Sequence, residues 1–239
     1  MNSLLEFTLE AHGGLARWQE LHKVSAHLLN GGVLWPLKGK ANILDDVRVT
    51  AHLHEQWASH APFRKPNQHT LLLPDRVAIA TTEGTLVEEV LEPRATFEGH
   101  TLETPWSDLQ LAYFAGYAMW NYLTTPFNFT LPGYQVEELA PWQAHNQTLR
   151  RLQVTFPDHI ATHSKVQTFY INADGLIVRH DYDVAVAGGV PAVHYPSGHT
   201  EFAGIVVPTQ RIVYVRQPDL SPAPEPVVVS IALDDIQFS

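Results

Sequence analysis

The chain has 239 residues and carries 15 lysines and arginines against 25 aspartates and glutamates, a formal net charge of −10. An acidic surface with no basic run repels nucleic-acid phosphates and anionic membranes, so neither is an expected partner. The lack of cysteine excludes disulfides, thiolate nucleophiles and cysteine-ligated metals.

Length and composition predict a single folded domain over residues 1–239. Hydrophobic residues make up 45% of the chain and charged residues 17%, which is typical of a globular protein. The segment Met1–Glu10 lacks the basic start and uninterrupted apolar run of a signal peptide. No run approaches the roughly 18–20 apolar residues that a bilayer span needs. We therefore expect a cytoplasmic protein without a membrane span.

The first predicted element is a short helix. Ser3 can cap its start, and Glu6 completes a capping-box pattern three residues later. The pair Gly13-Gly14 ends it, because glycine readily adopts the left-handed conformation found after helices. A second short helical turn is expected over residues 15–21.

From Val24 the apolar spacing changes to two, which indicates strands. Strands are expected over 24–29 and 33–37. The stretch 46–59 alternates most clearly and predicts one strand with a buried and a wet face, Trp57 lying on the buried one. Turn residues separate further predicted strands at about 69–73, 76–81, 86–91, 150–156, 165–171, 176–186, 199–203, 205–216 and 227–237.

One segment breaks this β pattern. Thr104-Pro105 is a helix-start signal, and residues 106–123 then contain a single charge, Asp108. A helix that is apolar on nearly all sides is buried, and Pro126 ends it. The succession of local hairpins around it predicts an α+β, mainly β fold, in which an antiparallel sheet curls around this helix.

Three motifs accompany this order of elements: Ala11-His12-Gly13-Gly14 with Trp18, Asp174-Gly175-Leu176 leading into Arg179-His180-Asp181-Tyr182, and the stretch from Glu201 to Thr209. With these motifs, the chain resembles the LolA-like half-barrel, the fold of bacterial lipoprotein-localisation factors and related lipid-binding proteins. The chain is also similar to an uncharacterised bacterial family over nearly its whole length, including the helix at 104–122.

The resemblance implies a half-barrel whose concave cavity holds a small lipophilic or amphipathic ligand. The periplasmic carriers have an export signal, and this chain has neither that signal nor a lipobox cysteine. Delivery of lipoproteins to an outer membrane is therefore not expected.

Aromatic side chains are the candidate walls of that cavity. Some form a stripe at helical spacing along the buried helix, and others come from neighbouring segments. The alternative is a filled core, in a structural or partner-binding protein. The candidate ligand-binding residues are Trp35, Trp57, Trp106, Tyr113, Tyr117, Trp120, Phe127 and Phe129.

A second alternative is an enzyme that acts on a lipophilic molecule by acid–base catalysis. A hairpin between the strands around 180 and 200 would bring His180 near His199 or Glu201, and a histidine with a carboxylate suffices for proton transfer. The Gly/Pro-rich loop 187–199 is a candidate lid. The competing interpretation is a polar outer face with cross-strand ion pairs.

Asp108 is the fourth candidate catalytic residue. It suits the positive end of the helix dipole, and burial in a cavity would instead make it an acid of raised pKa. His52 and His54 share a strand face, but surface histidines explain them better than ligands because the spacing matches no zinc signature. No metal and no cofactor is predicted.

Overall fold

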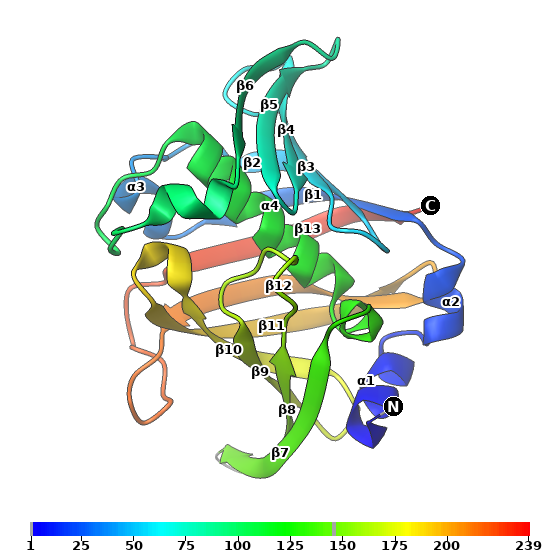
Figure 1. Cartoon of the computed structure of the whole chain (residues 1–239). Helices are drawn as coiled ribbons and strands as arrows, with labels where there is room; N and C mark the ends of the chain where they lie inside the picture. Colours follow the sequence, from blue (N-terminus) through cyan, green and yellow to red (C-terminus); the bar gives the residue numbers. More distant parts are fainter. Residues whose placement is uncertain (1, 145–146) are drawn as a thin grey trace.

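The computed structural model describes residues 2–144 and 147–239. The described chain is mainly β: its strands form one antiparallel sheet that curls into an open half-barrel around a helix (Figure 1). The strands are β1 (Lys23–Gly31), β2 (Asp46–His52), β3 (Ala58–Ala61), β4 (Gln68–Leu73), β5 (Arg76–Thr81), β6 (Leu86–Leu91), β7 (Gln135–Ala144), β8 (Gln147–Thr155), β9 (Val166–Ile171), β10 (Ile177–Val184), β11 (Val190–Phe202), β12 (Ile205–Val215) and β13 (Val229–Phe238).

Helices cover the ends and the inside of this sheet. The α-helices are α1 (Ser3–Ala11), α2 (Leu15–Gln19), α3 (Leu34–Leu37) and α4 (Asp108–Thr124), and the 3₁₀ turns are η1 (Pro93–Phe97), η2 (Phe127–Thr130) and η3 (Ala185–Ala187). No helix in the described part of the chain is long and apolar enough to cross a membrane.

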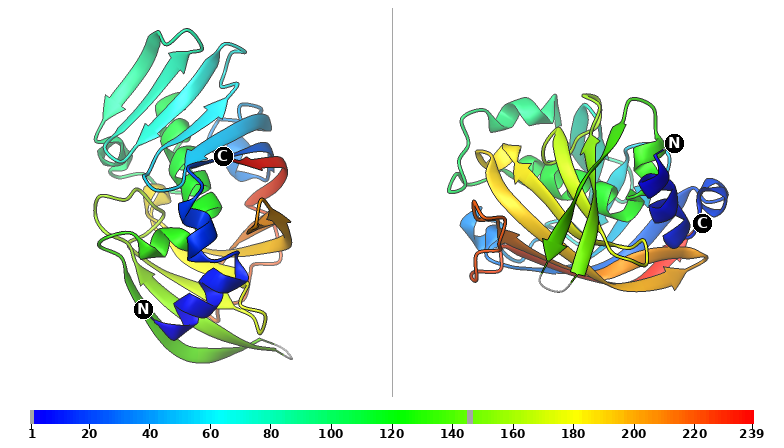
Figure 2. Two further views of the ribbon diagram at one scale, coloured as in Figure 1. Left: turned by 90° about the vertical axis from the view of Figure 1, so that its right-hand side faces the viewer. Right: turned by 90° about the horizontal axis from the view of Figure 1, so that it is seen from below.

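The sheet topology explains why α4 lies inside the curl. The strand order is β6-β5-β4-β3-β2-β1-β13-β12-β11-β10-β9-β8-β7, so most neighbours are consecutive in sequence. The chain leaves the sheet at the β6 edge and returns at the opposite edge, β7. The connection carries α4 through the concave side, as Figures 1 and 2 show.

Helix α4 confirms the predicted buried helix, with a corrected start. Ser107, not Thr104, is its N-cap: the Ser107 side chain accepts from the Gln110 N–H, and Gln110 accepts from the Ser107 N–H. Every residue from 111 to 124 is buried. At Gly116 an added Cβ would lie 2.9 Å from Leu72 Cβ, so glycine allows the helix to approach β4 closely.

The structure also corrects the start of the first helix and the predicted strand at 33–37. Asn2, not Ser3, caps α1 by accepting from Leu4 and Leu5 N–H groups. Residues 33–37 hold the short helix α3 rather than a strand, and the Trp35 indole donates back to the Gly31 carbonyl.

The predicted strand 46–59 is divided in two, because the chain turns after His52 and resumes as β3. Strand β7 was not predicted. Its alternation is broken by a register shift between Leu139 and Trp142, with Pro141 between them.

Trp120 stabilises the turn between β2 and β3. Its indole is fully buried and its N–H donates to the carbonyls of His52 (2.9 Å) and Glu55 (2.8 Å). We expect Trp120→Ala to lower the free energy of unfolding by about 3–5 kcal/mol, measured by urea denaturation. Trp57→Ala is the matched control, since Trp57 is half-buried and stacks on His52; its expected loss is about 1 kcal/mol. Equal losses in the two variants would contradict this role for Trp120.

Candidate functional site

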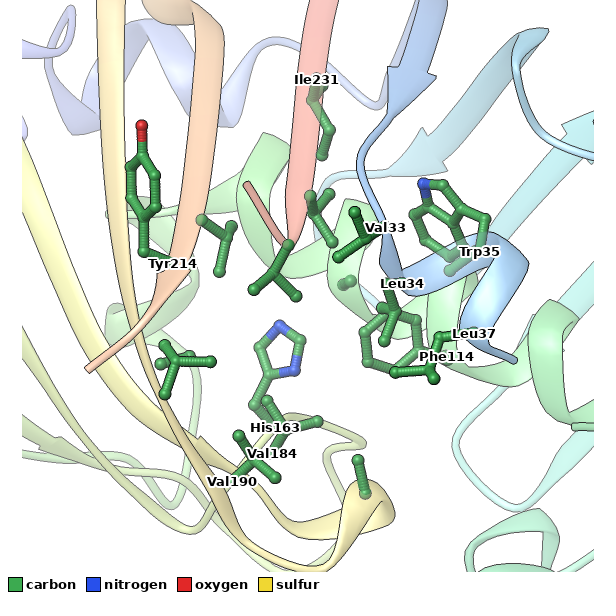
Figure 3. A pocket seen from close by; sticks show the side chains of 18 of the residues that line it. Val33, Leu34, Trp35, Leu37, Phe114, His163, Val184, Val190, Tyr214 and Ile231 are labelled. Carbon is green, nitrogen blue, oxygen red and sulfur yellow. The ribbon is translucent and has the colours of Figure 1, made fainter. Parts of the chain in front are cut away.

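A cavity of about 200 Å³ lies between α4 and the concave face of the sheet. Its walls are mostly aliphatic and aromatic, and Figure 3 shows the ring of His163 among them. Three regions contribute most: α4 with Phe114, Ala118 and Met119, the chain around α3 with Val33, Leu34 and Trp35, and the central strands with Val213 and Ile231. The site is thus assembled from segments distant in sequence.

Three polar residues of the cavity lining, Tyr122, His163 and Tyr182, are linked by hydrogen bonds. The Tyr122 hydroxyl lies 2.9 Å from His163 Nε2 and 3.0 Å from the Tyr182 hydroxyl, and the Tyr117 hydroxyl lies 3.3 Å from His163 Nδ1. Burial, with a contribution from Arg94, lowers the pKa of His163 to about 3. The neutral ring offers one donor and one acceptor, which the two hydroxyls at its nitrogens can match.

His60 is a second buried histidine at the cavity wall. Burial lowers its pKa to about 4, and neither ring nitrogen has a hydrogen-bond partner. It is therefore neutral at pH 7, like His163. The cavity wall carries no ionised histidine at that pH.

A smaller chamber of about 20 Å³ lies beyond Tyr122, which lines both spaces. Two strands extend from one space to the other: Tyr182 and Val213 line the large cavity, while His180 and Arg211 line the chamber. Residues two apart on a strand share a face and are about 7 Å apart along it. The chamber is thus the polar continuation of the same concave surface.

The structure places the predicted ligand-binding aromatics mainly in the core. Of the eight, Trp35 lines the large cavity. The stripe of Tyr113, Tyr117 and Trp120 lies on the opposite side of α4, because successive residues turn by about 100°. Phe127 stacks on Trp18 at 4.2 Å. Trp57, Trp106 and Phe129 likewise pack outside the cavity lining, on His52, Phe114 and Phe169 respectively.

The cavity-lining residues of α4 were not singled out from the sequence. They mix small and large side chains on one face of the helix: Phe114, Ala115, Ala118, Met119 and Tyr122. Helical periodicity groups these residues on the face opposite the stripe, and this pattern in the sequence could have indicated a second candidate wall.

The structure does not bring the candidate catalytic residues together. The predicted hairpin forms between β10 and β11, but its register places His180 opposite His194. His180 stacks on Phe169 at 4.0 Å and contacts Gln167 Oε1 at 2.6 Å. His199 and the exposed Glu201 lie further along β11, His199 Nε2 being 3.0 Å from the Ile177 carbonyl.

Asp108 lies at the start of α4, away from the other three. It forms ion pairs with Lys40 (2.5 Å) and Arg64 (3.0 Å). The helix start and these two cations provide a structural reason for its charge. It does not line the large cavity.

The predicted lid is wrong. Residues 190–202 form strand β11, which is paired with β10 on one side and β12 on the other. Its glycines and prolines are typical of a loop, but the neighbouring strands β10 and β12 both pair with it. The start of this segment contributes Val190 and Ala192 to the cavity rim and wall.

No cluster of three or more histidine, aspartate or glutamate side chains placed to hold a metal is found within residues 2–144 and 147–239. His52 instead contacts Glu55 at 2.8 Å and stacks on Trp57. His54 Nε2 lies 2.7 Å from the Leu21 carbonyl.

Solved structures of other proteins share this architecture. A DUF1329 family protein from Desulfovibrio piger superimposes with a TM-score of 0.58 at 10% identity, covering 99% of this chain and 92% of that one. A LolA superfamily protein from Nitrosomonas europaea gives a TM-score of 0.54 at 11% identity, covering 98% and 91%. No protein-family model matches the sequence, and no curated protein matches it. The chain therefore has a LolA-like fold, as the sequence motifs predicted.

Proposed function

We propose that this chain is a binding protein for a small lipophilic or amphipathic molecule, held between α4 and the concave face of the sheet. The observation that carries the proposal is the apolar cavity of about 200 Å³. An apolar cavity of ~150 Å³ in another protein stays dry and takes up benzene, so this one has room for roughly eight carbon atoms. The LolA-like fold supports the same reading.

The cavity favours a carrier over an enzyme. Acid–base catalysis needs a titratable group that faces the substrate with a free donor or acceptor. Among the described residues, two histidines line the cavity. Both nitrogens of His163 are occupied by Tyr117 and Tyr122. The nitrogens of His60 are free, but burial lowers its pKa to about 4, which makes it a weak base at pH 7.

Of the candidate catalytic residues, His180 lines the smaller chamber and His199 lies near it. Glu201 is exposed, and Asp108 pairs with Lys40 and Arg64. Within the described chain, no hydrogen bond or ion pair joins a candidate histidine to a candidate carboxylate.

Chain-length dependence tests the proposal. Burying one methylene contributes about 0.8 kcal/mol, which corresponds to a roughly fourfold gain in affinity. We expect n-alkanols to bind the delipidated protein with that gain per carbon, measured by isothermal titration calorimetry. The gain should level off near eight carbons, where the cavity is full.

Two results would contradict the proposal. One is the absence of octanol binding together with the absence of any co-purified lipophilic molecule in native mass spectra. The other is an alkanol affinity that does not depend on chain length, since a surface site would not sense the depth of a cavity. Alkanols carry no charge, so this measurement isolates the apolar cavity from charged groups nearby.

A further inference from the structure

Arg211 is a buried cation on the concave face of β12. Its side chain is 5% exposed. Nη2 donates to the Tyr122 carbonyl at 2.8 Å, and Nη1 lies 3.4 Å from His194 Nε2. The Nε–H has no hydrogen-bond partner. The guanidinium therefore retains donor capacity inside the protein.

No aspartate or glutamate of the described chain forms an ion pair with Arg211. The other buried arginine in this part of the sheet, Arg179, differs: its Nε lies 2.7 Å from Asp181 Oδ1, on the opposite face of the sheet. Burial lowers the pKa of Arg211 to about 10, which still leaves the group charged at pH 7. Buried charges in proteins are normally paired, because an uncompensated one is costly to desolvate.

The groups around the chamber cannot neutralise this charge. His12 and His180 line it, His194 contacts Arg211, and His199 lies with its ring centroid 6.1 Å from that of His12. Burial is the main cause that lowers the pKa of all four, and the Arg211 charge lowers each further. Tyr122 and Tyr182, which also face Arg211, have raised pKa values through burial, so they remain neutral too.

We propose that the chamber binds a small singly charged anionic group, a halide ion or a carboxylate, at the free Nε–H of Arg211. The space of about 20 Å³ favours one such small group over the larger phosphate or sulfate. A water molecule would satisfy the N–H, but it would leave the charge uncompensated.

The anionic group has two possible sources. One is a free ion, which makes the site independent of the large cavity. The other is the headgroup of the molecule in that cavity, since Tyr122 lines both spaces and Arg211 lies two residues from Val213. This second source rests on the proposed function.

Thermal unfolding of Arg211→Met and the parent protein tests the free-ion source. Melting temperatures are measured against chloride, bromide and acetate at constant ionic strength. The difference between the two proteins removes general salt effects. We expect the parent to gain on the order of 3 °C per tenfold increase of the preferred anion above its Kd, and the variant to gain none. Arg48→Met is the control, because Arg48 is a surface arginine already paired with Asp235; it should behave like the parent.

Binding of decanoate and decanol tests the headgroup source. If the headgroup occupies the chamber, the parent binds decanoate at least tenfold more tightly than decanol, and Arg211→Met abolishes the difference. Decanol is uncharged, so its binding to the parent reports on the apolar cavity alone. If the parent binds neither decanol nor decanoate, the result contradicts the proposed function as well as the headgroup source.

Crystals of the parent protein soaked in bromide provide a measurement that does not depend on the variant folding. An anomalous peak within hydrogen-bond distance of Arg211 Nε supports the site. The proposal is overturned if no peak appears, the anion dependence of parent and variant is the same, and decanoate binds no more tightly than decanol.

Discussion

Lowering the pH from 7 to 4 is expected to unfold the protein. The cause is a set of buried neutral histidines whose pKa values lie below the usual 6.5, mainly because burial disfavours the charged ring. The pKa of His12 and of His60 is lowered to about 4 and that of His163 to about 3. The pKa values of His180 and His194 are also well below the usual value.

The direction follows from proton uptake. Below about pH 6.5 the unfolded chain takes up protons on these rings while the folded protein does not, so acid favours unfolding. The stabilisation is complete above pH 6.5 and is lost as the pH falls toward the folded-state pKa values. Each ring costs up to about 1.4 kcal/mol per pH unit. Five rings acting together exceed a typical folding free energy of ~5–15 kcal/mol within two to three units.

Urea unfolding followed by circular dichroism at pH 7.5, 6.5, 5.5 and 4.5 measures this effect. His60→Leu is the informative variant, because His60 makes no hydrogen bonds through its ring. It should reduce the slope of the unfolding free energy against pH by the contribution of one proton. It removes no hydrogen bond, because the His60 ring makes none. A stability that stays flat from pH 7 to 4.5 would show that these rings take up protons in the folded state.

Filling the cavity is expected to abolish ligand binding. Ala118 lies on the cavity side of α4, and Ala118→Phe would place a ring in a space of about 200 Å³. The ring would displace about six carbons of ligand, so the affinity for octanol should fall at least ~100-fold. Because the ring fills a void, the melting temperature should be unchanged or higher.

Val166→Phe is the matched control. Val166 is 48% exposed on β9, so the same ring is added outside the cavity and binding should be retained. A folded Ala118→Phe protein that binds as the parent does would place the ligand elsewhere. Loss of binding in both variants would point to a change in the whole fold.

The general architecture could be predicted from the sequence, whereas the site could not. A segment with one charge over residues 106–123 has to be buried, and the structure confirms it. Which side of α4 borders a void depends on how the sheet curls around it. The stripe of large aromatics lies on the filled side, because large side chains occupy the space that they face, whereas the cavity lies on the side of Ala115 and Ala118.

The pairing of β11 with its neighbours was the second feature that the sequence pattern did not predict. Gly188, Gly189, Pro191, Pro196 and Gly198 made residues 187–199 look like a loop, but pairing on both sides stabilises a strand there. That longer strand sets His194, rather than His199, opposite His180.

Arg211 was missed although a signal was present. It alternates with Val207 and Val213 on one face of β12, which makes it a cation on an apolar face. Such a residue is rarely buried without a partner. The position of a charge within the strand period is therefore a better indicator of a buried polar site than clusters of titratable residues along the sequence.

The pairing of β1 with β13 has a consequence for how the chain reaches its folded state. Val24 lies opposite Phe238, whereas most other neighbours in the sheet are joined by short hairpins. Hairpins within β1–β6 and within β7–β12 can form early, since their loops are short. Joining the two halves requires closure of a very long loop, and contacts of that separation slow folding. Until β13 docks, the inner edge of β1 stays open, so the half-folded chain is the species most exposed to wrong pairing with other chains.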